Sequence, residues 1–286
     1  PISHSLAVVL VNLIKPFAAI ITTIARWAAH FPVLSIGKGG FSFALALIGA
    51  LVVLIFRKKA VVALLVIAIA ALFLARFPTH DWNIFVCNVG QGDATVINLH
   101  HHRAIVIDVG PDPVLMDKCL RTLQINEITL LIVTHPHADH IGGLAGARKG
   151  RTIKNEWFGN VTAGAVAHVG EYSIRVVWPM AGPAIDDNPN NASIAALITS
   201  RDFSLFAAGD IEPPVQERLR GQLGHVDIYK VAHHGSRYQD DVLLRELSPR
   251  IALIEVGKGN TYGHPADSTL TALRRLGADI YRSDID

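Results

Sequence analysis

Three histidines and one aspartate lie within residues 135–140, in the sequence His-Pro-His-Ala-Asp-His. The apolar run 130–133 precedes them and predicts a buried strand, and the glycine-containing stretch after them predicts the start of a helix. His135 and His137 are two residues apart, so an extended backbone can direct both at one ion, while the aspartate and the last histidine can turn toward a second. Imidazole and carboxylate ligands suit Zn²⁺, Mn²⁺ or Fe²⁺. The segment therefore predicts a metal site on a loop between a strand and a helix.

A second histidine cluster follows the strand-like run 227–232. One of its two histidines is expected to face the site as an acid, a phosphate contact or a replacement ligand, with His234 favoured over His233. A buried structural role for the other one stays open. Ser236 can cap the next helix, whose free amides would favour an anion such as phosphate. Three basic residues flank these loops, where they could bind phosphate or lie on a solvated surface: Lys230, Arg237 and Lys258.

The segments around these clusters predict the elements that position them. Strand-like runs follow one another between residues 82 and 109, and later strands alternate with helical stretches such as 212–222 and 240–247. Mixed sheets with helices outside suit an α/β protein built as a four-layer αβ/βα sandwich. The three histidines at 100–102 fall between two predicted strands and are expected to form a hairpin turn.

The run 135–140 is the H-x-H-x-D-H signature of the metallo-β-lactamase superfamily, and the chain resembles that fold from about Trp82 to its end. Asp210 and His264 each follow a strand-like run, in the order in which this superfamily places its later ligands. The resemblance implies two divalent metal ions, Mn or Zn, that promote hydrolysis. The implied metal ligands are His135, His137, Asp139, His140, Asp210 and His264.

Other residues take catalytic or supporting roles in this resemblance. Asp210 is expected to bridge the two ions, and Asp139 either binds the second ion or moves a proton. Asp139 and His234 are the catalytic candidates. Asp108 follows a strand as the superfamily's buried aspartate does, so it is expected to orient the ligand loop. Asp93 either faces the site or stabilises a turn.

The superfamily usually supplies one more histidine between the first motif and Asp210. The corresponding region contains Asn190 and Asn191, and His168 is expected to lie in a turn before the strand 172–178. The first ion is therefore expected to lack one imidazole and to bind water or an amide oxygen in its place. Such a site favours harder ions, which predicts better support by Mn²⁺ than by Zn²⁺. Changing Asn191 to histidine is expected to tighten metal binding if its side chain points inward.

A wider set of motifs narrows the resemblance. In chain order the motifs are Val89-Gly90-Gln91-Gly92-Asp93, Ile107-Asp108-Val109-Gly110, Asn191-Ala192-Ser193, Gly209-Asp210-Ile211-Glu212, His233-His234-Gly235-Ser236, Asn260-Thr261-Tyr262-Gly263-His264-Pro265 and Tyr281-Arg282-Ser283-Asp284. Together they resemble the C-terminal domain of the ComEC family, which imports single-stranded DNA across the bacterial inner membrane. The resemblance implies single-stranded DNA, the membrane, and the DNA-receptor and translocation proteins of the competence machinery as partners.

The first part of the chain is far more apolar than the rest. Residues 41–56 and 60–75 carry no charge, and three basic residues at 57–59 divide them. With some extension through the interface each run can span a membrane, so a transmembrane helical hairpin is expected at 41–76, with a buried soluble hairpin as the alternative. The basic turn favours the cytoplasmic side, which would place the metallo-β-lactamase-like domain, 77–286, outside the cytoplasm.

Residues 1–40 are expected to form an amphipathic or membrane helix. Polar side chains such as Asn12, Lys15 and Arg26 fall on one narrow stripe of such a helix. The helix would either lie in the membrane interface or face a polar path within a bundle. Because the chain begins at Pro1 and ends without a stop-like tail, it is expected to be a piece of a longer multi-pass protein of the inner membrane.

Composition adds little about partners. The net charge of +2 is too small to indicate nucleic-acid binding by itself. The two cysteines, Cys87 and Cys119, form no metal or redox motif. They are expected to be buried small hydrophobic residues, with a disulfide as the minor alternative.

Different classes of function stay open at this point. The first is a metal-dependent nuclease attached to a DNA-uptake channel, which would degrade the strand that is not imported. The second is a domain that only binds or guides DNA, because the missing histidine has removed catalysis. A membrane-tethered metallo-hydrolase of small esters is less favoured, since no small apolar pocket is indicated. The oligomeric state is not indicated by the sequence.

Overall fold

The computed structural model describes residues 82–285 and 61–71, together with positions 15, 19, 21–23, 48, 49, 51 and 59. The chain divides into two compact units, Pro1–Ala75 and Arg76–Asp286. Among the described positions, no helix combines the length and apolar character needed to cross a bilayer. Most of the predicted membrane hairpin and of the predicted N-terminal helix lies outside the described residues.

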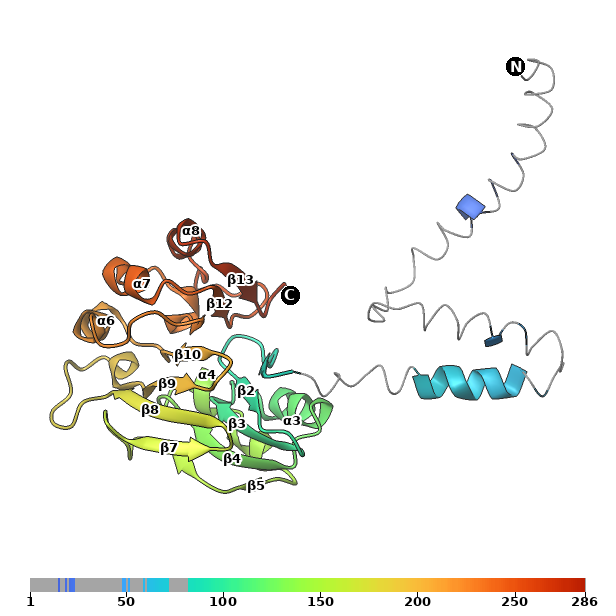
Figure 1. Ribbon diagram of the computed structural model, residues 1–286, viewed down its shortest axis with the longest axis horizontal. Coiled ribbons are helices and arrows are strands. Elements are labelled where there is room, and N and C mark those ends of the chain that lie inside the picture. The colour runs from blue at the N-terminus through green and yellow to red at the C-terminus, as the bar shows by residue number, and fades with distance from the viewer. Residues whose placement is uncertain are drawn as a thin grey trace, which may run out of the picture. The chain divides into compact units, whose positions relative to one another are not determined.

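The second unit contains two β-sheets that share a hydrophobic layer (Figure 1). The first sheet has the strand order β1-β2-β3-β4-β5, and β6 also pairs with β4. Its strands are β1 (Ile84–Val86), β2 (Thr95–Asn98), β3 (Arg103–Ile107), β4 (Glu127–Ile132), β5 (Thr152–Ile153) and β6 (Glu156–Trp157). The expected turn at residues 100–102 is confirmed, because these residues connect the antiparallel strands β2 and β3.

The second sheet has seven strands in the order β13-β12-β11-β10-β9-β8-β7. Its strands are β7 (Val166–Val169), β8 (Tyr172–Trp178), β9 (Ala195–Thr199), β10 (Ser204–Ala207), β11 (Ile228–Lys230), β12 (Ile251–Ile254) and β13 (Asp279–Arg282). β7 to β10 are antiparallel neighbours, and β10 to β13 are parallel. The expectation of a turn at His168 is wrong, because this residue pairs with Ser173 of β8 within the sheet.

Helices cover the outer face of each sheet, which confirms the αβ/βα sandwich. The helices of this unit are α3 (Pro113–Thr122), α4 (Ala138–Ile141), α5 (Leu144–Arg148), α6 (Pro213–Leu219), α7 (Asp241–Leu247) and α8 (Asp267–Arg275), with 3₁₀ turns η1 (Pro189–Ala192) and η2 (Ala232–Gly235). α3 packs on the first sheet, while α6, α7 and α8 lie together on the second (Figure 1).

Strand β3 shows how the sequence produces this layering. Its side chains alternate between two faces, as in any strand. Ile105 and Ile107 contribute to the layer between the sheets, whereas Ala104 and Val106 contribute to the layer under α3. Because both faces are buried, the strand is apolar at every position after Arg103, which is typical of sheets covered on both sides.

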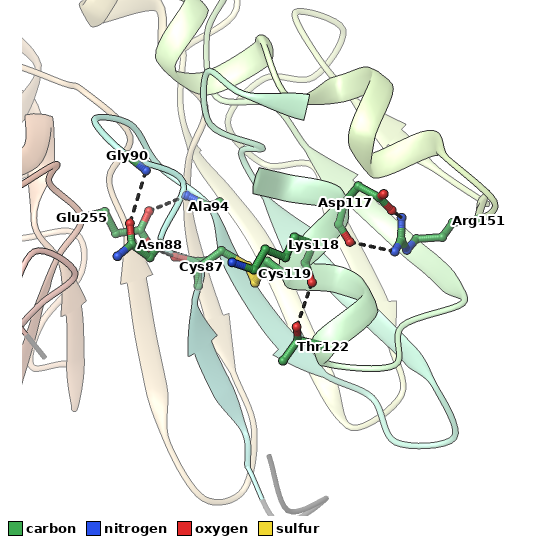
Figure 2. Close-up of a disulfide and its surroundings, with 11 residues drawn as sticks. Cys87, Asn88, Gly90, Ala94, Asp117, Lys118, Cys119, Thr122, Arg151 and Glu255 are labelled. Atoms are coloured by element: carbon green, nitrogen blue, oxygen red, sulfur yellow. Dashed lines mark hydrogen bonds and ion pairs between the residues drawn. A yellow bond between two sulfur atoms is a disulfide. The ribbon is translucent and has the colours of Figure 1, made fainter. Parts of the chain in front are cut away.

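Cys87 and Cys119 form a disulfide, which corrects the expectation of two unlinked cysteines (Figure 2). Their Cα atoms are 5.9 Å apart, well within the range that a disulfide requires. Cys87 follows β1 and packs in the same hydrophobic layer as Cys119 of α3. The two residues are 32 positions apart in the chain, so their proximity comes from the packing of α3 on the first sheet and has no local signal.

Candidate metal centre

The predicted site residues gather where four buried strands end. Asp108 directly follows β3, and Asp210 comes shortly after β10. The histidine loop follows β4, and the second histidine pair follows β11. In sheets of this kind the loops after the carboxyl ends of parallel strands form the crevice in which ligands bind. Here loops from both sheets line one cavity of about 590 Å³.

Asp108 holds the histidine loop in place. Its Oδ1 accepts hydrogen bonds from the backbone nitrogen of Thr134 at 2.7 Å and from the Thr134 hydroxyl at 3.0 Å. Its Oδ2 lies 3.0 Å from His140 Nδ1. A carboxylate at Nδ1 places the ring proton there and leaves Nε2 free as a ligand atom. Asp108 itself has a φ of 58°, a left-handed conformation that is uncommon outside glycine.

Two glycines allow the loops to approach this closely. Gly92 has a φ of 147°, and a Cβ atom there would lie 2.3 Å from the backbone oxygen of Asp139. The backbone nitrogen of Asp93 can therefore donate a hydrogen bond to that oxygen at 3.1 Å. Gly209 has a φ of 59°, and a Cβ atom there would lie 2.8 Å from the Ser193 side chain. Both positions thus require glycine for conformation and for space.

Asp139, His140, Asp210 and His234 form the centre of the site. One ligand atom from each lies within 4.8 Å of the ligand atoms of the other three. Asp210 Oδ2 is 3.2 Å from His140 Nε2 and 3.7 Å from His234 Nε2. Asp139 Oδ2 is 3.2 Å from His234 Nε2. Two imidazoles and two carboxylates at this spacing suit a divalent transition metal.

His135 and His137 lie next to this centre, with the His135 ring 4.1 Å from the His140 ring between centroids. His135 Nε2 is 3.9 Å from Asp210 Oδ2, and the rings of His135 and His137 are 4.6 Å apart between centroids. The Asp210 carboxylate is therefore close to His135 as well as to His140 and His234 of the four-residue centre. That is the position a bridging carboxylate would occupy between two ions.

Buried polar atoms without hydrogen-bond partners gather at the cavity and at the metal-ligand cluster next to it. Within the described part of the chain they are His135 Nε2, His140 Nε2, Asn190 Oδ1, Asp210 Oδ1, His233 Nδ1 and His264 Nδ1. Buried polar atoms are nearly always hydrogen-bonded, so this group of six atoms, four of them on residues that line the cavity, indicates a ligand. Because all of them are nitrogen or oxygen atoms of metal-binding side-chain types, the residues present fit divalent metal ions.

The charges of His135 and Asp210 agree with this interpretation. Burial opposes protonation of His140 and His234, but the carboxylates around them raise the pKa of both, so an ion would have to displace a proton from each. Burial, reinforced by neighbouring His140, lowers the pKa of His135 to about 3, so this imidazole is neutral and available as a ligand. Burial opposes the ionisation of Asp210, but His140 and His234 outweigh it and hold the pKa of Asp210 well below its usual range. Asp210 is therefore a carboxylate at neutral pH, and it offers negative charge to a cation.

His234 completes the four-residue centre, whereas His264 lies on the wall of the cavity. His234 Nδ1 is 2.8 Å from the backbone oxygen of Glu255 and 3.0 Å from Asp93 Oδ1. Both partners are acceptors, so the proton resides on Nδ1 and Nε2 faces the centre. The His264 ring is 6.3 Å from the His234 ring between centroids. In the sequence, the position of His234 shortly after the strand-like run of β11 is the signal that it can reach the site, because β11 is the parallel neighbour of β10.

A buried group of three ionisable side chains, Asp93, Lys230 and Glu255, lies next to His234. Lys230 is only 1% exposed, which corrects its interpretation as a flanking phosphate contact or surface residue. Its ammonium group contacts Asp93, and its Nζ is 3.8 Å from Glu255 Oε2. Glu255 Oε2 also accepts a hydrogen bond from the backbone nitrogen of Ala94 at 2.7 Å. Asp93 thus contacts both Lys230 and His234 of the site. No local sequence pattern marks Lys230 or Glu255 as partners of Asp93.

The other predicted residues occupy varied positions. The expectation that Ser236 caps the next helix is wrong, because Asp240 caps α7 by accepting from the backbone nitrogen of Leu243 at 2.7 Å. Asn191 directs both ends of its amide to protein partners outside the cavity. Lys258 is exposed. His233 lines the cavity, and its Nδ1 is 3.2 Å from a carboxylate oxygen of Glu212 without hydrogen-bond geometry.

Residues 87–243, which carry the histidine loop, Asp210 and His234, match the sequence profile of the Metallo-beta-lactamase superfamily. The chain belongs to this superfamily. The match covers more than half of the chain and includes every member of the four-residue centre. Membership indicates a metal-dependent hydrolase, and the candidate ligand cluster indicates divalent metal ions.

Curated relatives confirm the resemblance to the ComEC family. The chain is 24% identical over 260 residues to ComE operon protein 3 of Bacillus subtilis, in a match that covers 74% of this chain and 33% of the relative. It is 27% identical over 212 residues to Recombination protein 2 of Haemophilus influenzae, which covers 68% of this chain and 26% of the relative. The chain therefore spans a third or less of these proteins.

The metallo-β-lactamase fold protein YhfI from Bacillus subtilis is 10% identical, with a TM-score of 0.47, over 70% of this chain and 95% of that protein.

Proposed function

We propose that this chain is part of a DNA-uptake channel of natural transformation, and that its second unit is a metal-dependent nuclease that degrades the strand that is not imported. The observation that carries the proposal is the convergence of Asp139, His140, Asp210 and His234 at one cavity. The similarity to ComE operon protein 3 supports DNA as the substrate. The DNA-receptor and translocation proteins of the same machinery would be its partners.

Two divalent ions would polarise the phosphodiester and make water a stronger nucleophile. His135, His137 and Asp210 would hold one ion. Asp139, His140 and His234 would hold the other and share Asp210 with the first. The orphaned Nε2 atoms of His135 and His140 and the orphaned Oδ1 of Asp210 support this division.

Asp139 and His234 are the candidates for proton transfer. Burial opposes the ionisation of Asp139, but the hydrogen bond from His234 and the charge of His140 lower the pKa of Asp139. Asp139 is therefore a carboxylate at neutral pH, and its side chain is 33% exposed. It can accept a proton from the attacking water and return that proton to the leaving oxygen. His234 Nε2, 3.2 Å from Asp139 Oδ2, could share in this transfer only while it does not hold an ion.

The mouth of the cavity supports a single-stranded substrate. Tyr262 lines the cavity and is 69% exposed. Its ring is parallel to that of His264 to within 19°, with centroids 6.2 Å apart. Aromatic side chains in such positions stack on unpaired bases without regard to sequence. A double-stranded substrate would keep its bases stacked on one another and would not use this pair.

We place the chain in the bacterial inner membrane, with the second unit outside the cytoplasm. Residues 61–71 are helical and expose apolar side chains such as Val62 and Leu65. Within the same unit Gly49 packs so closely on Leu64 that a Cβ atom would lie 2.6 Å from it, which supports a helical hairpin. The disulfide in the second unit supports an oxidising compartment, because disulfides persist there and are rare in the cytosol.

Cleavage of labelled single-stranded DNA by the full chain in detergent, with added Mn²⁺ or Zn²⁺, tests the proposal. His137→Ala and Asp210→Ala should each abolish cleavage and lower the bound metal, measured by elemental analysis, because each removes a ligand. His168→Ala is the matched control, because this histidine is exposed on β7. Wild-type protein that binds DNA and metal but leaves the DNA intact would refute the nuclease and favour a DNA-guiding domain.

A further inference from the structure

The side chain of Asn190 presents a buried amide oxygen at the cavity without a hydrogen-bond partner among the described residues. It lies on η1 between β8 and β9, it is 9% exposed, and it lines the cavity together with Asp210 and His137. Within the described residues its Oδ1 atom is buried and accepts no hydrogen bond. Leaving a buried amide oxygen unpaired costs about 1–3 kcal/mol, so an unused oxygen of this kind indicates a ligand.

Glu212 determines which end of the amide faces this ligand. The Asn190 Nδ2 group donates a hydrogen bond to Glu212 Oε1 at 3.2 Å. An ionised carboxylate can only accept hydrogen bonds, so the nitrogen of Asn190 must face it and the oxygen must point away from it. The Glu212 carboxylate is itself held by Asn188, whose Nδ2 donates to Oε2 at 3.0 Å. The orientation of the Asn190 oxygen therefore follows from the hydrogen-bonding chemistry of the two side chains as well as from their positions.

The neighbouring Asn191 is excluded from the same role. Its Nδ2 donates to Asp186 Oδ2 at 2.7 Å, and its Oδ1 accepts from the backbone nitrogen of Glu212 at 2.8 Å. Both ends of this amide are occupied, and Asn191 does not line the cavity. The side chain at position 191 therefore does not point into the cavity, and Asn191→His is not expected to tighten metal binding.

From this geometry we infer that Asn190 Oδ1 is a ligand of the first metal ion, where the superfamily usually has a histidine, and that Glu212 is the positioning residue that directs it. The inference rests on the metal centre of the proposed function. His135 and His137 would supply nitrogen to this ion, Asp210 its shared carboxylate and Asn190 a neutral oxygen. A neutral oxygen in place of an imidazole makes the site harder, which favours Mn²⁺ over Zn²⁺.

Binding of Mn²⁺ alone to the full chain, measured by electron paramagnetic resonance, tests the inference without reference to activity. Wild type should bind two ions. Asn190→Ala should weaken one of them by roughly tenfold or more and leave the other unchanged, because only the first ion loses a ligand. Glu212→Gln should weaken the same ion by a smaller factor, because a glutamine amide no longer forces the orientation of Asn190. His168→Ala, at an exposed position on β7, is the control and should leave the Mn²⁺ affinity unchanged.

The Asn190→His variant adds a spectroscopic test. Electron spin echo measurements on bound Mn²⁺ should show one more coordinated imidazole than in wild type, and the affinity for Zn²⁺ should rise. Asn190→Ala with two ions bound at wild-type affinity would refute the role of Asn190 while leaving the metal centre intact. Loss of the first ion on His233→Ala, with Asn190→Ala unaffected, would assign the position to His233. Wild type that binds no Mn²⁺ would instead refute the metal centre itself.

Discussion

Replacing Lys230 by methionine should destabilise the second unit even in the absence of metal. Methionine has a similar length but no charge, so the replacement leaves the carboxyl groups of Asp93 and Glu255 buried without their ammonium partner. All three side chains are at most 2% exposed. Water cannot replace the lost contact, and the cost of an unpaired buried charge applies in full.

The expected loss can be worked out from the protonation states. Removing one partner of a buried ion pair costs about 3–5 kcal/mol. Burial raises the pKa of Glu255 to about 8, so at pH 7 this group is mostly protonated. Asp93 is then the only ionised carboxylate that loses its ammonium partner, and it keeps the contact with His234 Nδ1 at 3.0 Å. The lower end, about 3 kcal/mol, is therefore expected. For a domain of this size about 1 kcal/mol corresponds to roughly 2–4 °C, so Tm should fall by roughly 10 °C.

Thermal unfolding followed by circular dichroism, with chelator present, measures this loss. Burial opposes ionisation of Asp93, but Lys230 and His234 hold its pKa well below the usual range. The contribution of ionised Asp93 to stability is present at neutral pH and is lost in acid. Because the variant can also protonate Asp93, the difference in Tm between variant and wild type should shrink below about pH 4. Lys258→Met, at an exposed position, is the control. A change in Tm of less than 2 °C at pH 7 would show that the reasoning about buried charge is wrong.

Two further predictions concern stability. Replacing both Cys87 and Cys119 by alanine should lower the free energy of unfolding by about 3–4 kcal/mol, as expected for a closed loop of this length; urea unfolding curves that coincide with those of wild type would contradict this. The pKa of Glu255 rises from 4.5 to about 8 on folding, so its contribution is complete below about pH 4.5 and is lost as pH rises toward 8. Glu255→Gln should therefore flatten the fall of Tm between pH 5 and 8 in metal-free protein, and an unchanged slope would argue against a protonated Glu255.

Local sequence was sufficient for features that depend on nearby residues. The spacing of His135, His137 and His140 after an apolar strand predicted a ligand loop, since the strand and the turn are both local. The alternation of strands and helices predicted the sandwich, because two-sided burial leaves a continuous apolar run such as that of β3. The motif around Asp210 depended on resemblance, and its place after β10 agrees with it.

Tertiary structure alone decided which distant residues meet. His234 rather than His264 joins the four-residue centre because β11 lies beside β10, whereas the His264 loop begins one strand farther out, after β12. Lysine is usually exposed, yet Lys230 is buried because Asp93 approaches it from the other sheet. The disulfide, and the fact that Asn190 rather than Asn191 lines the cavity, were likewise decided by tertiary contacts. Each depends on contacts between elements far apart in the chain, and residue type and spacing carry no information about such contacts.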